Sequence, residues 1–168
     1  AITCPASKSY THRAIAIASL VNGKSVLTNV LLSRDTLATI NACKKFGSRI
    51  TQTDGIITIS GRNKFHHGNR EIDAENSGTT IRVMIAMSAL VESGKTTLTG
   101  DESLRKRPMQ PLLDALMRLG VDSTSTNGML PVVVQGGGIK GGYTEINGDG
   151  HVQDAGSHKH PTNREQNG

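Results

Sequence analysis

The sequence predicts an α/β (α+β) chain made of two tandem copies of one βαβαββ unit. The first observation is an internal repeat: Arg13 and Arg82 open matching segments 69 positions apart, and Gly47 and Gly120 close matching segments 73 positions apart. An offset that grows slowly is what short loop insertions between two copies of a unit produce. The second observation is that helix-like and strand-like segments follow one another in the same order in both copies.

The first helix of each copy is expected to be amphipathic and to end at a glycine. Apolar residues recur at i, i+3, i+4 and i+7 in the first copy, which is the spacing of one helix face, and on a comparable face in the second. These residues are Ala14, Ile17, Ala18 and Val21 in the first copy and Ile81, Met84, Ile85 and Ala89 in the second. Gly23 and Gly94 follow as helix stops. We expect both faces to pack into the core.

Strands and a second helix complete each copy. β-Branched residues favour strands at 25–28 and 55–60 in the first copy and at 96–99 and 130–135 in the second. The second helices are expected over about 36–46 and 111–119, and Pro111 suits a first helical turn.

These elements divide the chain into repeat one, about 1–65, and repeat two, about 66–148. Together they form one lobe, 1–148, and we expect the polar stretch 149–168 to be a disordered tail because it holds almost nothing apolar. Among 168 residues, 35% are hydrophobic, with two Phe, two Tyr and no Trp, so the interior must be aliphatic. No apolar run approaches the roughly 20 residues of a membrane span, so we expect no membrane partner.

The net charge of +5 raises the question of nucleic-acid binding. Basic residues are not interleaved with aromatic residues that could stack on bases, so we expect no nucleic-acid partner. Cations instead gather at the predicted helix starts, which favours a small polyanion. They are Lys8, Arg13, Arg82, Arg105, Lys106 and Arg107. For Arg105 and Lys106, a solvated face is the alternative.

Cysteines and histidines do not predict a metal site. Cys4 and Cys43 have no metal-ligand spacing and suggest ordinary thiols in a reducing, cytoplasmic setting. The other candidates are loop histidines without acidic or thiol neighbours. They are His66, His67, His151, His158 and His160.

The segment Pro5-Ala6-Ser7-Lys8-Ser9-Tyr10-Thr11-His12-Arg13 carries the strongest functional signal. A helix start offers unpaired N–H groups and the positive end of the helix dipole, so anions bind there. Lys8 adds a point charge, Ser9 a short donor and Arg13 a two-pronged donor one turn later. The pattern indicates recognition of a phosphorylated small molecule; a capped, solvated helix start is the alternative.

A second segment, Asn76-Ser77-Gly78-Thr79-Thr80-Ile81-Arg82, repeats this arrangement. Small donors again precede a helix with an arginine in its first turns. Gly78 lacks a Cβ, so a ligand can approach the backbone closely there. Alone, such a motif is usually a turn or a cap; its value lies in its register with the first segment.

Together with a third segment, Leu98–Met109, these two motifs resemble the 5-enolpyruvylshikimate-3-phosphate (EPSP) synthase family over residues 2–148. The resemblance implies a two-lobed enzyme with an inside-out barrel architecture, three βαβαββ units per lobe and no cofactor. It implies transfer of the enolpyruvyl group from phosphoenolpyruvate to shikimate 3-phosphate, on the route to aromatic amino acids. Two of the three units of one lobe are present here.

The resemblance also implies roles for individual residues. Lys8, Ser9 and Arg13 would contact shikimate 3-phosphate, and Lys8 would also act in catalysis. Phosphoenolpyruvate, and the inhibitor glyphosate that competes for its site, would meet Lys8, Asn76, Gly78, Arg82 and Arg107. Catalysis would rest on positioning and charge stabilisation.

Departures from the family pattern keep alternatives open. Ala6 stands in place of the usual glycine, Val83 in place of proline or phenylalanine, and the second lobe is absent from the sequence. The chain could therefore retain only substrate binding, as a phosphometabolite-binding module or as half of a pair completed by a second lobe. A relative of UDP-N-acetylglucosamine enolpyruvyl transferase is disfavoured by Lys8-Ser9 and by a loop at 105–108 without cysteine.

Overall fold

The structure, a computed structural model, describes residues 5–62, 65 and 68–146, and the predicted tail lies outside these ranges. The first half contains α1 (Lys8–Leu20), β1 (Gly23–Leu27), α2 (Arg34–Lys45), β2 (Arg49–Thr53) and β3 (Ile56–Gly61). The second half contains β4 (Arg70–Asp73), α3 (Gly78–Ala89), β5 (Lys95–Thr99), α4 (Glu102–Arg105), α5 (Gln110–Arg118), β6 (Ser123–Thr126) and β7 (Met129–Gln135).

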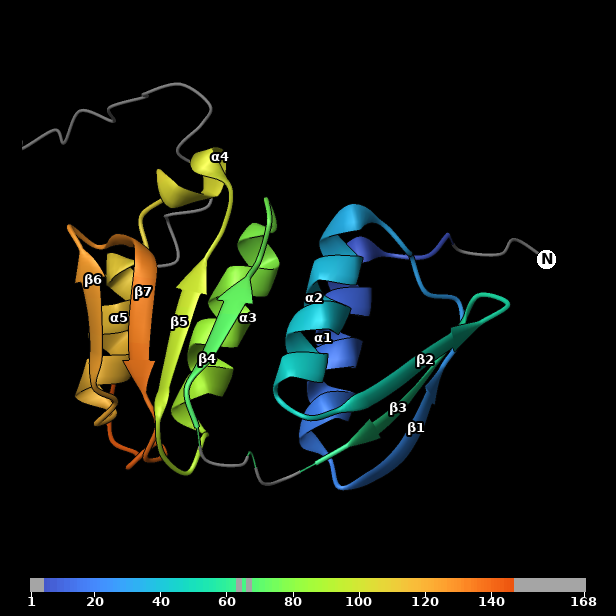
Figure 1. Cartoon of the computed structure of the whole chain (residues 1–168), viewed down its shortest axis with the longest axis horizontal. Helices are drawn as coiled ribbons and strands as arrows, with labels where there is room; N and C mark the ends of the chain where they lie inside the picture. The colour runs from blue at the N-terminus through green and yellow to red at the C-terminus, as the bar shows by residue number, and fades with distance from the viewer. Residues whose placement is uncertain (1–4, 63–64, 66–67, 147–168) are drawn as a thin grey trace, which may run out of the picture.

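The strands form two sheets with helices α1, α2 and α3 between them (Figure 1). The first sheet has the order β1-β3-β2 and is antiparallel throughout. The second has the order β4-β5-β7-β6, in which β4 and β5 run parallel and the other neighbours antiparallel. Apart from the extra short helix α4, the second half has the βαβαββ order, and the predicted fold class is confirmed.

The repeat extends to buried positions in the two opening helices. Each buried residue of α1 has a buried counterpart 69 positions later in α3. The α1 residues are Thr11, His12, Ile15, Ala16, Ala18 and Ser19, and their α3 counterparts are Thr80, Ile81, Met84, Ile85, Met87 and Ser88. Ser19 and Ser88 also make the same bond, with each hydroxyl donating to the carbonyl four residues earlier. The two helices are therefore copies in packing as well as in sequence.

Both closing hairpins use the same turn. Asp54 and Gly55 join β2 to β3 with φ of 48° and 74°, and Asn127 and Gly128 join β6 to β7 with φ of 53° and 71°. Positive φ at both central residues is the type I′ geometry, whose twist matches that of paired strands. The turns lie 73 positions apart, as the sequence repeat requires.

The prediction for the buried face of α1 was wrong. Ile17 and Val21 are 62% and 51% exposed, and Ala14 is half-buried, so only Ala18 of the expected face lies in the core. Helix α1 packs against α2, α3 and β3 through its opposite side, which includes the polar Thr11 and His12. The expected face of α3 was correct, since all four of its residues are buried.

The core is aliphatic, as the composition predicts. Its only aromatic side chains in the described ranges are Phe46 and Phe65, whose ring centroids lie 5.3 Å apart. No helix in these ranges is both long and apolar enough to cross a bilayer.

Candidate functional site

Three serine-capped helices begin at the same edge of the molecule. The first turns of α1, α2 and α3, together with α4, lie along the upper edge in Figure 1. Ser7, Ser33 and Ser77 are the N-caps, and each side-chain oxygen accepts from a backbone N–H three residues later. The positive ends of three helix dipoles are therefore gathered at this edge, which favours bound anions.

The first group of predicted residues lies at the start of α1. The Lys8 ammonium pairs with the Asp35 carboxylate of α2 at 2.8 Å, and the Lys8 side chain is 55% exposed. The Arg13 guanidinium donates to the Ser9 hydroxyl at 2.7 Å. Because all these side chains reach solvent, an acidic ligand could exchange with water there.

The second group surrounds Gly78 at the start of α3. A Cβ at Gly78 would stand 3.0 Å from Nη1 of Arg107 and 3.1 Å from Nη1 of Arg82. Arg82 donates to the Gly78 carbonyl at 3.0 Å. Burial, and secondly the charge of Arg107, lowers the pKa of Arg82. Two like charges beside a bare backbone form a place where an anion would relieve repulsion.

Asn76 and Asp101 hold this group in place. The Asn76 amide donates to Asp101 at 2.6 Å, and Arg107 donates to the Asn76 carbonyl oxygen at 3.4 Å. Asp101 caps α4 by accepting from the N–H of Leu104 at 2.8 Å. The Asn76 amide, followed by the Leu104 N–H, lowers the pKa of Asp101, so this anchor stays ionised. Sequence reasoning missed Asp101, although an aspartate before a short helical run is a capping signal.

Of the three adjacent cations in the third motif, Arg107 faces Gly78. Arg105 ends α4 and donates to Thr99, and Lys106 pairs with Glu102 one turn earlier. The prediction that all three stand at a helix start is therefore wrong, because α4 was not expected. For Arg105 and Lys106, the alternative of a surface position is supported.

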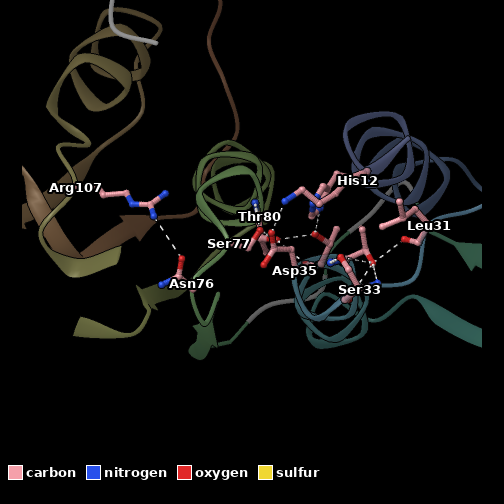
Figure 2. A network of polar contacts seen from close by, with 11 residues as sticks. His12, Leu31, Ser33, Asp35, Asn76, Ser77, Thr80 and Arg107 are labelled. Carbon is pink, nitrogen blue, oxygen red and sulfur yellow. Dashed lines mark hydrogen bonds and ion pairs between the residues drawn. The ribbon is translucent and has the colours of Figure 1, made fainter. Parts of the chain in front are cut away.

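Asp35 connects the two groups (Figure 2). Its carboxylate holds Lys8, and its backbone carbonyl accepts from the Thr80 hydroxyl at 3.3 Å. A second clamp joins Arg34 to Glu75 at 2.5 Å, tying the start of α2 to the loop before α3. Within the described residues, no hydrogen bond joins Lys8, Ser9 or Arg13 directly to the Gly78 group. The sequence signal for Asp35 was its place in the first turn behind a serine cap.

Other candidate chemistry is weaker. No group of three potential metal ligands occurs within the described ranges. Cys43 is buried, and burial raises the pKa of its thiol to about 11, which makes it an unreactive thiol at neutral pH. A basic hollow of about 580 Å³ lined by Lys44, Arg49 and Arg62 lies at the C-terminal end of α2, where cations neutralise a helix terminus.

The repeated units and the cationic helix starts define the class of protein: an α/β chain assembled from βαβαββ units, with cationic and hydroxyl side chains gathered at one edge. Comparison with known proteins identifies the family within this class. The family model described as EPSP synthase (3-phosphoshikimate 1-carboxyvinyltransferase) matches residues 1–157, and the chain belongs to this family.

Curated relatives agree with this assignment. The chain is 51% identical over 148 residues to the 3-phosphoshikimate 1-carboxyvinyltransferase of Nitrosopumilus maritimus, covering 88% of this chain and 35% of the relative. For the enzyme of that name from Methanococcus maripaludis strain C7, identity is 47% over 150 residues, with the same coverage. A solved EPSP synthase from Acinetobacter baumannii superimposes with a TM-score of 0.71 at 30% identity, over 81% of this chain and 32% of that one. The chain thus spans about a third of the length of these relatives.

Proposed function

We propose that this chain supplies the acid-binding groups for transfer of the enolpyruvyl group from phosphoenolpyruvate to shikimate 3-phosphate. The observation that carries the proposal is Gly78, a residue without a side chain, flanked by the guanidinium groups of Arg82 and Arg107. A dipole end, a bare backbone and two cations together match a ligand that carries both phosphate and carboxylate.

Shikimate 3-phosphate would bind at the start of α1. Lys8, Ser9 and Arg13 provide an ammonium, a hydroxyl and a guanidinium within two helical turns. Arg13 and Ser9 already lie within hydrogen-bond distance, so their donors converge on one space. A phosphate there would compete with Asp35 for Lys8.

Phosphoenolpyruvate, and glyphosate in competition with it, would bind across both groups. Lys8 would reach it from α1, while Asn76, Gly78, Arg82 and Arg107 would hold it from the α3 side. Lys8 would also stabilise the charge that develops as the phosphate leaves. This step depends on placement rather than on a cofactor, since the residues offer positioned donors and charge.

Calorimetric titration of shikimate 3-phosphate into the chain tests the binding part of this proposal. We expect binding to the wild-type chain and an affinity at least about tenfold lower for Lys8→Ala, the effect of losing one charge-assisted hydrogen bond. The matched control is Lys24→Ala, which removes an equal charge from exposed β1. Equal affinities for the Lys8 and Lys24 variants, or no binding by the wild-type chain, would refute it.

Turnover is tested separately by a coupled phosphate-release assay. The chain is assayed alone and together with a second polypeptide covering the remaining length of its relatives. Phosphate release by the chain alone, abolished by Lys8→Ala, identifies a self-sufficient enzyme. Release only after the second polypeptide is added identifies a binding lobe that needs a partner.

A further inference from the structure

A chain of buried polar side chains crosses the three helices behind the site (Figure 2). Nδ1 of His12 on α1 lies 2.7 Å from the Thr39 hydroxyl on α2, which lies 2.7 Å from the Thr80 hydroxyl on α3. Thr80 continues to the Ser77 hydroxyl at 2.6 Å and to the Asp35 carbonyl at 3.3 Å. His12, Thr39 and Thr80 are each at most 1% exposed.

The internal repeat shows that two members of this chain, His12 and Thr39, are not needed for packing. The residue 69 positions after His12 is Ile81, and the residue 73 positions after Thr39 is Leu112. Ile81 is fully buried and Leu112 packs against the core, so the same fold accepts apolar side chains at both places. Replacing both partners of a buried hydrogen bond by apolar groups of the same shape is nearly neutral or stabilising, and a buried atom without a partner, such as Nε2 of His12, is costly. The presence of His12 and Thr39 in the first copy therefore calls for a role beyond filling space.

The tautomer of His12 sets the direction of these hydrogen bonds. Nε2 of His12 is buried and has no partner, and burial lowers the pKa of this ring, which favours the neutral imidazole at pH 7. An orphaned lone pair is less costly than an orphaned N–H, which places the proton on Nδ1. Nδ1–H then donates to Thr39, Thr39 donates to Thr80, and Thr80 donates to Asp35 or Ser77.

One end of the chain borders both groups of the site. Ser77 caps α3 directly before Gly78, and Asp35 holds Lys8. His12 immediately precedes Arg13 on α1. Thr39 contributes no atom to either group of ligand-facing residues, yet its single hydroxyl bonds to side chains of both α1 and α3. Asp35 also links α2 to both helices, through its carboxylate to Lys8 and its backbone carbonyl to Thr80.

We propose that Thr39 is a positioning residue that fixes the spacing between the Lys8 group on α1 and the Gly78 group on α3. This inference rests on the proposed function, because it concerns a ligand that touches both groups. Phosphoenolpyruvate is such a ligand. Shikimate 3-phosphate, held from α1 alone, is not.

Calorimetry on Thr39→Val tests the proposal, since valine keeps the volume of threonine and removes its hydroxyl. We expect affinity for phosphoenolpyruvate, measured with shikimate 3-phosphate saturating, to fall about tenfold, whereas affinity for shikimate 3-phosphate changes less than about twofold. Thr39→Ser, which keeps the hydroxyl, restores phosphoenolpyruvate affinity. Thr51→Val on exposed β2 is the matched control and leaves both affinities unchanged.

The outcomes separate the two proposals. A wild-type chain that binds neither ligand refutes the proposed function itself. A folded Thr39→Val variant that loses both affinities equally, or neither, refutes the positioning role alone. Nitrogen-15 NMR of the His12 ring supplies a readout without ligand: we expect the Nδ1-protonated neutral tautomer in the wild-type chain and a changed ring signal in Thr80→Val, which does not touch His12. An unchanged signal would overturn the directed chain.

Discussion

Gly78 is the residue of the proposed site at which a side chain would crowd two arginines. Its φ is not in the left-handed region, so its role depends on space rather than on backbone freedom. The guanidinium groups of Arg82 and Arg107 occupy the volume that a side chain would take. Both are ends of long, flexible side chains, which can move aside at small cost.

Gly78→Ala should therefore change binding while sparing the fold. Alanine is the better helix former by up to about 1 kcal/mol, so the free energy of unfolding stays level or rises slightly. The added methyl displaces the two arginines, and phosphoenolpyruvate affinity should fall about tenfold or more. Denaturant unfolding and calorimetry measure the two effects. A variant that unfolds more easily yet binds normally would contradict this view of Gly78.

The buried His12 should make stability depend on pH. Desolvation lowers its pKa in the folded chain, with Asp35 opposing the shift and Lys8 adding to it. Since the unfolded chain takes up the proton more readily, stability is full above the ordinary histidine pKa of about 6.5 and falls as pH drops from there toward the folded pKa. Urea unfolding at several pH values should show that the free energy of unfolding falls less steeply with decreasing pH in His12→Gln than in the wild-type chain. If the free energy of unfolding depended on pH in the same way in both proteins, His12 would be excluded as the source of the pH dependence.

At the scale of elements, one glycine in each copy lets the last strand meet the end of the opening helix. A Cβ at Gly61 would lie 2.2 Å from the Ala18 carbonyl oxygen, and one at Gly136 would lie 2.7 Å from that of Val91. The backbone N–H groups of the next residues, Arg62 and Gly137, donate to the carbonyl oxygens of Ser19 and Val91, respectively. This contact fastens β3 to α1 and β7 to the end of α3.

Gly61→Ala should be strongly destabilising because the neighbours of the new methyl are backbone atoms that cannot move alone. We expect a loss of about 1–3 kcal/mol in the free energy of unfolding, as for other overpacked sites. Ser60→Ala, at the exposed neighbouring position, is the control and should change stability by less than about 0.5 kcal/mol. Thermal unfolding compares the two, and equal melting temperatures would show that the strand can shift.

The elements that the sequence predicts well are those with local signals. The local patterns placed α2 and α5 within about two residues of their observed bounds, and the repeat predicted the fold class, whereas the short helix α4 was not expected. β2, β4 and β6 received no assigned range because their sequences, RITQT, REID and STST, carry little apolar signal. The face of α1 was misjudged because tertiary partners, not periodicity, decide which side is covered.

The same holds at the site: charged motifs were visible, whereas Thr39 and Asp101 act through contacts distant in sequence.

At the scale of the whole molecule, an apolar face on α1 and β1 remains uncovered within the described residues. Tyr10, Ile17 and Val26 are 74%, 62% and 56% exposed, and a hollow beside them is lined by Pro5, Leu27 and Val30 among others. Exposed apolar clusters of this kind favour association. The relatives, about three times as long, have further chain that could cover such a face.

Ile17→Lys should reduce self-association of this chain without weakening the fold. The side chain is exposed, so the free energy of unfolding should change by less than about 0.5 kcal/mol. Sedimentation equilibrium should show concentration-dependent association in the wild-type chain and less of it in the variant. If the Ile17→Lys variant associated as strongly as the wild-type chain, the surface that mediates self-association would lie elsewhere.

We propose that the two groups of side chains at the starts of α1 and α3 form one anion site. The most direct measurement is an NMR titration of the nitrogen-15-labelled chain with shikimate 3-phosphate followed by phosphoenolpyruvate. We expect shifts at Lys8, Ser9 and Arg13 with the first ligand, joined by Asn76, Gly78, Arg82 and Arg107 with the second. Shifts gathered instead around Lys44, Arg49 and Arg62 at the far end of α2, or none at all, would contradict it.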